Sequence, residues 1–163
     1  MATEKEFLVR IHIPVHVRWG DLDAYNHVNN VQMLRILEEA RVRALWAPDA
    51  RGGDDANTPP TAVISAAAGA DTTTLIAGHQ IEYLLPVEYQ RNPLDVQLWI
   101  GRFGGASAEI SYEVYCNDGL AVRAASTMVF MDSATGRPRR ISDAERAAWA
   151  DYVDEPVQLR SRN

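Results

Sequence analysis

Side chains able to do acid–base or carbonyl chemistry are concentrated in one short stretch, 19–30, which reads WGDLDAYNHVNN. Within about ten residues it supplies carboxylates, an imidazole and the start of a helix; these polar residues are Asp21, Asp23, Tyr25, Asn26 and His27. Unpaired N–H groups give a helix N-terminus partial positive charge, which suits an oxyanion or a polarised carbonyl. The stretch therefore predicts a site for carbonyl chemistry.

The same residue types also have ordinary structural roles, because Asp and Asn favour turns and helix N-caps. A calcium-binding EF-hand is excluded, since the loop lacks the glycine at its sixth position and Gln32 replaces the required glutamate. A transition-metal site would need a third ligand beside Asp21 or Asp23 and His27, and none is evident. We therefore expect no metal and no cofactor.

Two regular elements must hold this loop. Residues 7–19 alternate between apolar and polar side chains, which predicts a strand with one buried face that runs from Phe7 to Trp19. Residues 30–46 have a helical period with two apolar stripes. One stripe contains Met33, Ile36, Leu37, Ala40 and Ala44, and the other contains Val31, Leu34, Val42, Leu45 and Trp46. Two stripes indicate a helix covered by a sheet on one side and by adjoining structure or a partner subunit on the other.

Three stretches together resemble the hotdog-fold acyl-CoA thioesterases of the 4-hydroxybenzoyl-CoA thioesterase-like family. The first runs from Trp19 to Asn30 and continues in Leu34 and the run Glu38-Glu39-Ala40-Arg41. The second is Tyr83-Leu84-Leu85-Pro86-Val87, and the third is Val129-Phe130-Met131-Asp132, followed by Thr135-Gly136-Arg137-Pro138. The resemblance spans roughly Val9 to Ile141. The chain departs from the family pattern at Asn26, where family members often have glycine. Asn is the residue that best replaces glycine there, because it tolerates positive φ.

The resemblance implies hydrolysis of an acyl-CoA to a free acid and CoA. Asp23 matches the family's catalytic aspartate and would act as a nucleophile on the thioester carbon or as a general base for water. Backbone N–H groups around Asn29, Asn30 and Val31 would polarise the carbonyl. His27 and Asn30 would shape the loop or touch the substrate, and Tyr25 would line the pocket or anchor the loop.

Other readings stay open from the sequence. Some family members place the catalytic carboxylate on the helix, so Glu38 is a reserve candidate, although ion pairing along the helix is its ordinary role. A non-catalytic protein that binds acyl-CoA or an acyl carrier is the alternative to an enzyme. A hotdog dehydratase or hydratase is a third. The arginines Arg137, Arg139 and Arg140 form either a solvated turn or a docking point for the CoA phosphates.

The rest of the chain predicts an α+β arrangement in a single domain, 1–163, with its core at about 7–141. Strands are expected at 61–68, 75–85, 94–103, 109–116 and 120–131. A capping box, Ser142 with Glu145, predicts a short C-terminal helix at about 143–152. Residues 47–60 are expected to form a surface loop, and the tail after Pro156 to be loose. The hotdog fold implied by the resemblance is a curved antiparallel sheet around one long central helix, which pairs into dimers or tetramers.

Composition limits the function classes. A net charge of -6 argues against nucleic-acid binding, which needs a concentrated basic face. The chain has 1 cysteine, Cys116, so no internal disulfide can form, which fits a reducing cytoplasm. We expect a cytoplasmic enzyme with an acyl-CoA substrate, and no membrane or nucleic-acid partner, because no segment of membrane-span or signal-peptide character is evident.

Overall fold

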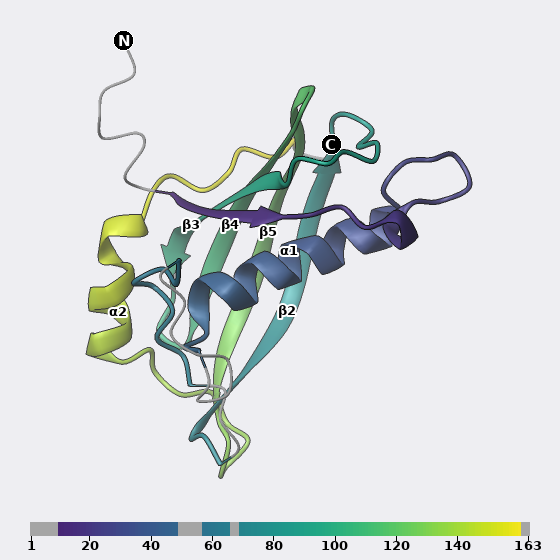
Figure 1. Cartoon of the computed structure of the whole chain (residues 1–163). Coiled ribbons are helices and arrows are strands. Elements are labelled where there is room, and N and C mark those ends of the chain that lie inside the picture. Colours follow the sequence, from purple (N-terminus) through teal and green to yellow (C-terminus); the bar gives the residue numbers. More distant parts are fainter. Residues whose placement is uncertain (1–9, 49–56, 66–68, 161–163) are drawn as a thin grey trace.

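The computed structural model describes residues 10–48, 57–65 and 69–160. Its centre is an antiparallel sheet of five strands in the order β1-β3-β4-β5-β2, with a helix across one face (Figure 1). The strands are β1 Ile11–Val15, β2 Thr72–Tyr83, β3 Leu94–Phe103, β4 Ser107–Cys116 and β5 Gly119–Asp132; the helices are α1 Asn30–Leu45 and α2 Asp143–Trp149. This arrangement is consistent with the hotdog fold. No helix in the described part of the chain is long and apolar enough to cross a bilayer.

Helix α1 forms as the sequence predicts. It begins after Asn29, whose side-chain oxygen accepts a hydrogen bond from the Val31 N–H at 2.9 Å and so caps the first turn. All members of its first apolar stripe are buried against the sheet. The second stripe divides, because Leu45 is buried whereas Val31 and Val42 stay 60% and 42% exposed. One apolar side of α1 is therefore uncovered in the single chain.

Strands β3, β4 and β5 form a meander with boundaries within two residues of the prediction. Tight turns join them. The second turn contains Gly119 at φ 114, a conformation that favours glycine. Their inward side chains form the core with α1, as the period of two requires.

Strand β2 lies at one edge of the sheet and pairs with β5 from Thr72↔Asp132 to Tyr83↔Val122, with an irregularity between Ile76 and Gly78. It begins three residues earlier than predicted. Strand β5 is 14 residues long, and its end pairs with residues 72–74, which were expected to lie between two strands. In the sheet as described, no other strand covers its outer edge.

The first predicted strand is too long. Its first residues, 7–9, lie outside the described residues. The ladder ends at Val15 because its partner β3 starts at Leu94, directly after Pro93, and Val15 pairs with Leu94. Trp19 therefore leaves the buried face. It stands in a 3-10 turn, Trp19–Asp21, is 76% exposed, and packs its ring edge-to-face on Tyr89.

The strand predicted at 61–68 is also wrong for its described part, 61–65. Ile64 makes a single parallel bridge to Trp46. Thr61 is buried because its hydroxyl donates to the Ala44 carbonyl at 2.7 Å, which ties this segment to the end of α1. Most of the predicted loop at 47–60 lies outside the described residues.

The chain after α2 is packed on the sheet, so the prediction of a loose tail is wrong. The indole N–H of Trp99 donates to the Glu155 carbonyl at 2.8 Å, and the Val157 N–H donates to the Ser111 hydroxyl at 3.1 Å. Gly101 has no side chain where Pro156 crosses, since a Cβ there would lie 3.1 Å from the Pro156 Cα. The tail crosses the sheet face opposite α1.

The capping box that opens α2 is confirmed. Ser142 accepts a hydrogen bond from the Glu145 N–H, and the Glu145 carboxylate accepts one from the Ser142 N–H. Glu145 also forms a two-point ion pair with Arg139, each bond 2.8 Å. Trp149 closes the end of the core, with its ring against Phe103 and Phe130.

Candidate active site

The loop before α1 is held by a buried carboxylate. Asp21 is 3% exposed, and its Oδ2 accepts the Arg18 N–H at 2.8 Å. Its Oδ1 accepts two bonds from the Arg18 guanidinium, and its backbone carbonyl accepts the Asn29 N–H at 2.9 Å. Asp21 thus anchors the loop from within, in keeping with the general preference of aspartate for structural roles in turns.

Asp23 occupies a tighter turn inside the same loop. Its Oδ1 accepts the Tyr25 N–H at 2.8 Å and, more weakly, the His27 N–H at 3.4 Å. Asn26 adopts φ 62, which confirms the expectation that asparagine keeps the conformation for which glycine is frequent. The carboxylate is therefore oriented by backbone donors rather than by a charged partner.

Asp23 lies in a pocket of about 340 Å³ together with Asn30 and Met33 from the start of α1. The opposite wall comes from the end of β2 and the segment after it, Tyr83, Leu84, Leu85, Pro86 and Val87, with Val122 from β5. The Tyr83 hydroxyl donates to the Asn30 carbonyl at 2.9 Å and joins the two walls. Partial burial raises the pKa of Tyr83, which keeps this hydroxyl a donor.

The helix N-terminus leaves one of the three predicted N–H groups available. The Asn29 N–H is bonded to the Asp21 carbonyl, and the Val31 N–H is bonded to the Asn29 side chain. No acceptor for the Asn30 N–H is found among the described residues. Asn30 therefore carries the free donor in the pocket that holds Asp23, and a carbonyl oxygen placed there would gain both this bond and the helix dipole.

The other predicted contact residues lie around the pocket rather than inside it. Tyr25 is 82% exposed and Val31 is 60% exposed, so both face outward in the single chain. His27 is partly buried and makes an isolated bridge to Glu88 through its backbone. Their predicted contacts with substrate stay predictions.

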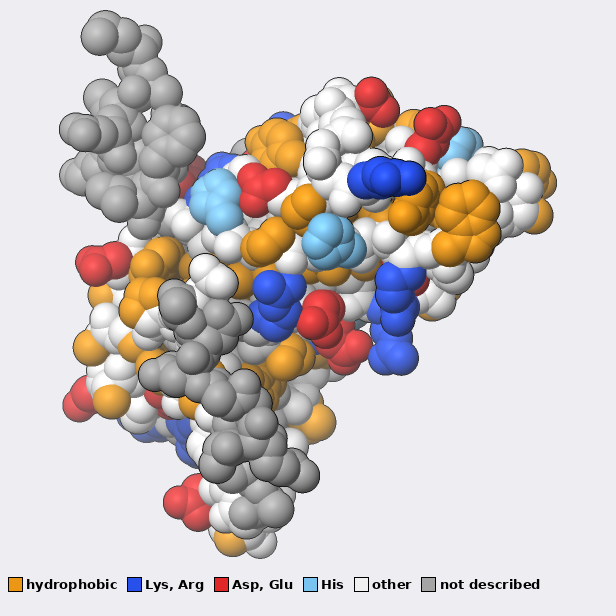
Figure 2. Space-filling view, viewed as in Figure 1, with side chains coloured by type: hydrophobic (Ala, Val, Ile, Leu, Met, Phe, Trp, Pro, Cys, Tyr) orange, Lys and Arg blue, Asp and Glu red, His pale blue; other side chains and the backbone are white. Residues whose placement is uncertain are grey.

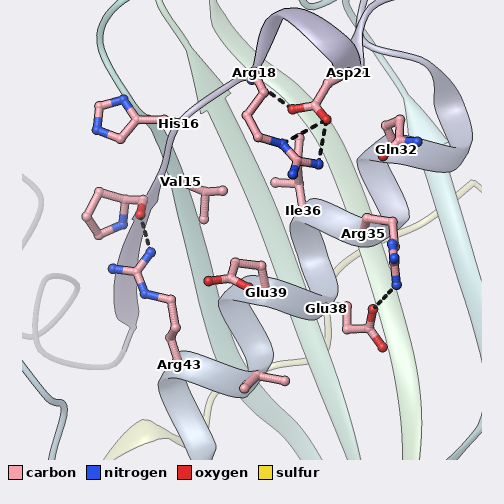
Figure 3. A pocket seen from close by; sticks show the side chains of 12 residues that line it. Val15, His16, Arg18, Asp21, Gln32, Arg35, Ile36, Glu38, Glu39 and Arg43 are labelled. Atoms are coloured by element: carbon pink, nitrogen blue, oxygen red, sulfur yellow. Dashed lines mark hydrogen bonds and ion pairs between the residues drawn. The ribbon is translucent and has the colours of Figure 1, made fainter. Parts of the chain in front are cut away.

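A larger groove, of about 730 Å³, lies on another side of α1, between that helix and β1 (Figure 3). It takes in Glu38, whereas Asp23 lines the smaller pocket. Its three arginines already have partners: Arg35 bonds Glu38 at 3.3 Å, Arg43 bonds the Pro14 carbonyl at 2.6 Å, and Arg18 bonds Asp21. Acidic, basic and apolar side chains are mixed over this face (Figure 2). We therefore take the smaller pocket as the candidate site, because Asp23 lines it together with Asn30, whose N–H has no acceptor among the described residues.

Arg139, the middle residue of the basic cluster before α2, is already bonded and so is a poor candidate for docking the CoA phosphates. Arg139 is committed to Glu145 and also donates to the Thr72 hydroxyl at 2.8 Å. Among the described residues no group of three or more His, Cys, Asp or Glu side chains is placed to hold a metal ion.

With the fold and site in place, comparison with known proteins gives the family. Residues 17–149 match the model of the thioesterase-like superfamily, which covers most of the chain. The chain belongs to this superfamily. No curated protein matches it.

Among solved structures, a predicted thioesterase from Bacillus stearothermophilus is 21% identical, with a TM-score of 0.70, over 91% of this chain and 99% of that one. The PA2801 protein from Pseudomonas aeruginosa is 29% identical, with a TM-score of 0.63, over 86% and 97%. A thioesterase from Thermus thermophilus, solved with coenzyme A and Zn, is 24% identical, with a TM-score of 0.60, over 86% and 95%. These similarities support the hotdog fold for this member of the thioesterase-like superfamily.

Sequence reasoning found the catalytic candidate in this thioesterase-like chain but missed part of its pocket. The stretch 83–87 belongs to the resemblance, yet nothing in its residue types assigned it the wall opposite Asp23. It also missed Arg41 and Tyr112, which meet beneath α1. A signal for the burial of Arg41 was present in the sequence. Arg41 follows Leu37 by four residues and precedes Ala44 by three, so a helical wheel places it beside the buried stripe.

Changing Asp21 to Ala is expected to destabilise the fold by about 1–3 kcal/mol, because the partly buried Arg18 N–H loses its acceptor. Urea midpoints measure this loss. The matched control is Arg18→Met, which removes a guanidinium whose side chain is 76% exposed and should cost less than about 1 kcal/mol. Equal effects of the two changes would contradict an anchor based on the backbone bond.

Proposed function

We propose that this protein is an acyl-CoA thioesterase, which hydrolyses the thioester of an acyl-CoA to a free acid and CoA. The observation that carries the proposal is that Asp23 lines one pocket at the N-terminus of α1 with Asn30, whose N–H has no acceptor among the described residues. Membership of the thioesterase-like superfamily supports it. The Thermus thermophilus relative that was solved with coenzyme A supports CoA as the carrier.

In the proposed reaction the thioester carbonyl oxygen accepts the Asn30 N–H, so charge that develops on that oxygen is stabilised. Asp23 then acts in one of two ways. As a general base it takes a proton from water, whose oxygen attacks the carbonyl carbon and expels CoA as thiolate, which is then protonated. As a nucleophile it forms a mixed anhydride with the acyl group and releases CoA, and water then hydrolyses the anhydride. Both routes consume one water and return the carboxylate unchanged.

We also propose that residues 1–163 form one hotdog domain in a cytoplasmic enzyme, with the curved sheet wrapped around α1, and that two copies pair through β2. In the described part of the chain no strand pairs with the outer edge of β2, which bears the half-exposed Leu75 and Tyr83. The uncovered apolar side of α1, with Val31 and Val42, offers a further surface for a second chain. Pairing would close the edge, which is a hazard when left open, and would bring Tyr25 and Val31 under cover.

Oligomeric state is the direct check on this pairing. Light scattering on the purified protein should give the mass of a dimer or tetramer at micromolar concentration. A stable monomer that still hydrolyses acyl-CoA would contradict pairing as a requirement for activity.

The function itself is tested by release of free thiol from a panel of short, long and aromatic acyl-CoAs, alongside hydration of an enoyl-CoA. Thioester hydrolysis is the expected result. Binding of acyl-CoA without turnover would make the protein a non-catalytic acyl-CoA or acyl-carrier binder. Hydration without hydrolysis would place it among the hydratases.

A further inference from the structure

The pocket that holds Asp23 has an open end and a closed end, which differ in the exposure of the residues that line them. The lining residues exposed to solvent are Asn30, Tyr83, Leu85 and Pro86. Three others are at most 4% exposed, namely Met33, Val87 and Val122. The exposed residues form the mouth of the pocket, and the buried ones form its floor.

The hydrophobic core lies directly behind this floor. Leu37 follows Met33 by about one turn of α1 and is 1% exposed. Ala124 is the next inward-facing residue of β5 after Val122 and is 2% exposed. Both belong to the core, whose side chains are close-packed. A chain of carbon atoms that enters the pocket must therefore end at Met33 and Val122.

Two hydrogen bonds hold the walls of the pocket together. The Tyr83 hydroxyl donates to the Asn30 carbonyl at 2.9 Å, which ties the end of β2 to the start of α1. The Val28 N–H donates to the Val87 carbonyl at 2.7 Å, which ties the loop that carries Asp23 to the segment after β2. Widening the pocket would break one of these bonds, so the fold sets its volume of about 340 Å³.

The proposed reaction decides which end of the substrate points inward. The phosphates of CoA are charged and would be costly to bury against an apolar floor, so CoA extends through the mouth and the acyl group points to the floor. Asn30, whose N–H would bind the carbonyl oxygen, precedes Met33 by three residues, or about 4.5 Å at ~1.5 Å each. Helical side chains lean toward the N-terminus, which shortens this gap. The acyl group therefore has a depth of less than about one helical turn, ~5.4 Å.

The floor also limits the polarity of the acyl group. Its side chains carry only hydrocarbon and thioether groups, and Asp23 is the one charged residue among those that line the pocket. A charged end on the acyl group would be buried at the floor without a partner of opposite charge. An uncharged end instead gains from contact with Met33, whose unbranched side chain fills irregular space.

We propose that the preferred substrates are CoA thioesters of short, uncharged acyl groups such as butanoyl-CoA, and that Met33 sets the upper limit of chain length. The inference rests on the proposed thioesterase function and names its substrate class. Met33 touches the end of the acyl group and takes no part in breaking the thioester, so it determines specificity. A longer chain must displace core side chains, and one methylene group that does not fit a hydrophobic pocket changes selectivity by about 10- to 200-fold.

A comparison of two chain lengths in three proteins tests the proposal. Wild type should hydrolyse butanoyl-CoA with a kcat/KM at least about 10-fold above that for octanoyl-CoA. Met33→Ala lowers the floor and should raise the rate for octanoyl-CoA relative to butanoyl-CoA by about 10-fold or more. Met128→Ala is the matched control, because it truncates a methionine that is 0% exposed, on β5 about 20 Å from Val122 at ~3.3 Å per residue. It should leave the ratio unchanged.

The other outcomes overturn the proposal or replace the variant. A wild-type preference for octanoyl-CoA would show that the acyl chain leaves through the mouth, and a ratio unchanged by Met33→Ala would remove Met33 as the limit. If Met33→Ala does not fold, the wild-type profile and Val122→Ala, which removes two methyl groups from the same floor, carry the test. If wild type hydrolyses no acyl-CoA, the thioesterase proposal fails separately. Calorimetry then decides, since tighter binding of butanoyl-CoA than of octanoyl-CoA supports the short pocket, and equal or weaker binding overturns it.

Discussion

Replacing Asp23 by Asn is expected to lower kcat for acyl-CoA hydrolysis by about 10² or more. The amide keeps an oxygen that can accept the Tyr25 and His27 N–H groups, so the turn should keep its shape. It can neither take a proton from water nor attack the thioester. Thiol release under saturating substrate measures the loss, and KM should change little because binding is not carried by this carboxylate.

Glu38→Gln is the matched control, since it makes the same chemical change on a carboxylate of α1 that bonds Arg35 and lines the groove toward β1. Its kcat should equal that of wild type. Loss of activity in Glu38→Gln with activity retained in Asp23→Asn would move the chemistry onto the helix. Full activity in both variants would contradict a catalytic carboxylate at either position.

The second large effect is on stability. Changing Glu145 to Gln is expected to cost about 2–3 kcal/mol at neutral pH, at or below the ~3–5 kcal/mol for breaking a fully buried pair, because both partners keep some contact with water. The change breaks the two-point bond to Arg139, and one amide nitrogen would face a donor. Urea unfolding measures the difference. Asp143→Asn in the same first turn removes only a favourable dipole interaction and should cost about 0.3–1 kcal/mol.

The cost of Glu145→Gln should also depend on pH. Burial disfavours the charged form of Glu145, but the bonds from Arg139 and Ser142 outweigh it and lower its pKa below the ordinary value. A carboxyl whose pKa is lowered on folding stabilises the protein above its unfolded pKa, and this contribution is lost as pH falls through the folded pKa. The gap between wild type and Glu145→Gln should therefore shrink as pH falls below the ordinary pKa of a glutamic acid, about 4.3. A gap that persists in acid would assign it to packing instead.

Local patterns in the sequence predicted the elements that they fully determine. The period of two placed β3, β4 and β5, the helical period placed α1, and the capping box placed α2, because each depends on residues close together in the chain. The candidate Asp23 came from a resemblance over a fixed spacing, which also depends on neighbouring residues. Asn26 at positive φ followed from the same resemblance, which has a frequent glycine at this position, and from the tolerance of asparagine for that conformation.

The features that the sequence did not predict correctly depend on residues far apart in the chain. The end of β1 at Val15 is decided by where β3 begins, and the early start of β2 by the length of β5. The packing of Pro156 over Gly101 requires two surfaces that no local pattern relates. The bond from Arg41 to Tyr112 joins residues 71 positions apart, so no local pattern in the sequence relates the two side chains.

The strand order has a consequence for the course of folding. Strands β3, β4 and β5 are consecutive, so only short loops must close to pair them. Pairing of β1 joins Ile11 to Leu98, and pairing of β2 joins Thr72 to Asp132, so both close much longer loops. Because closing a long loop costs more entropy before any contact forms, the three-stranded meander should nucleate and the two edge strands should dock afterwards. During synthesis α1 leaves the ribosome before the meander exists. Its apolar face therefore stays without a native partner until β3 and the strands after it have emerged, and it is the part of the nascent chain most open to non-native association.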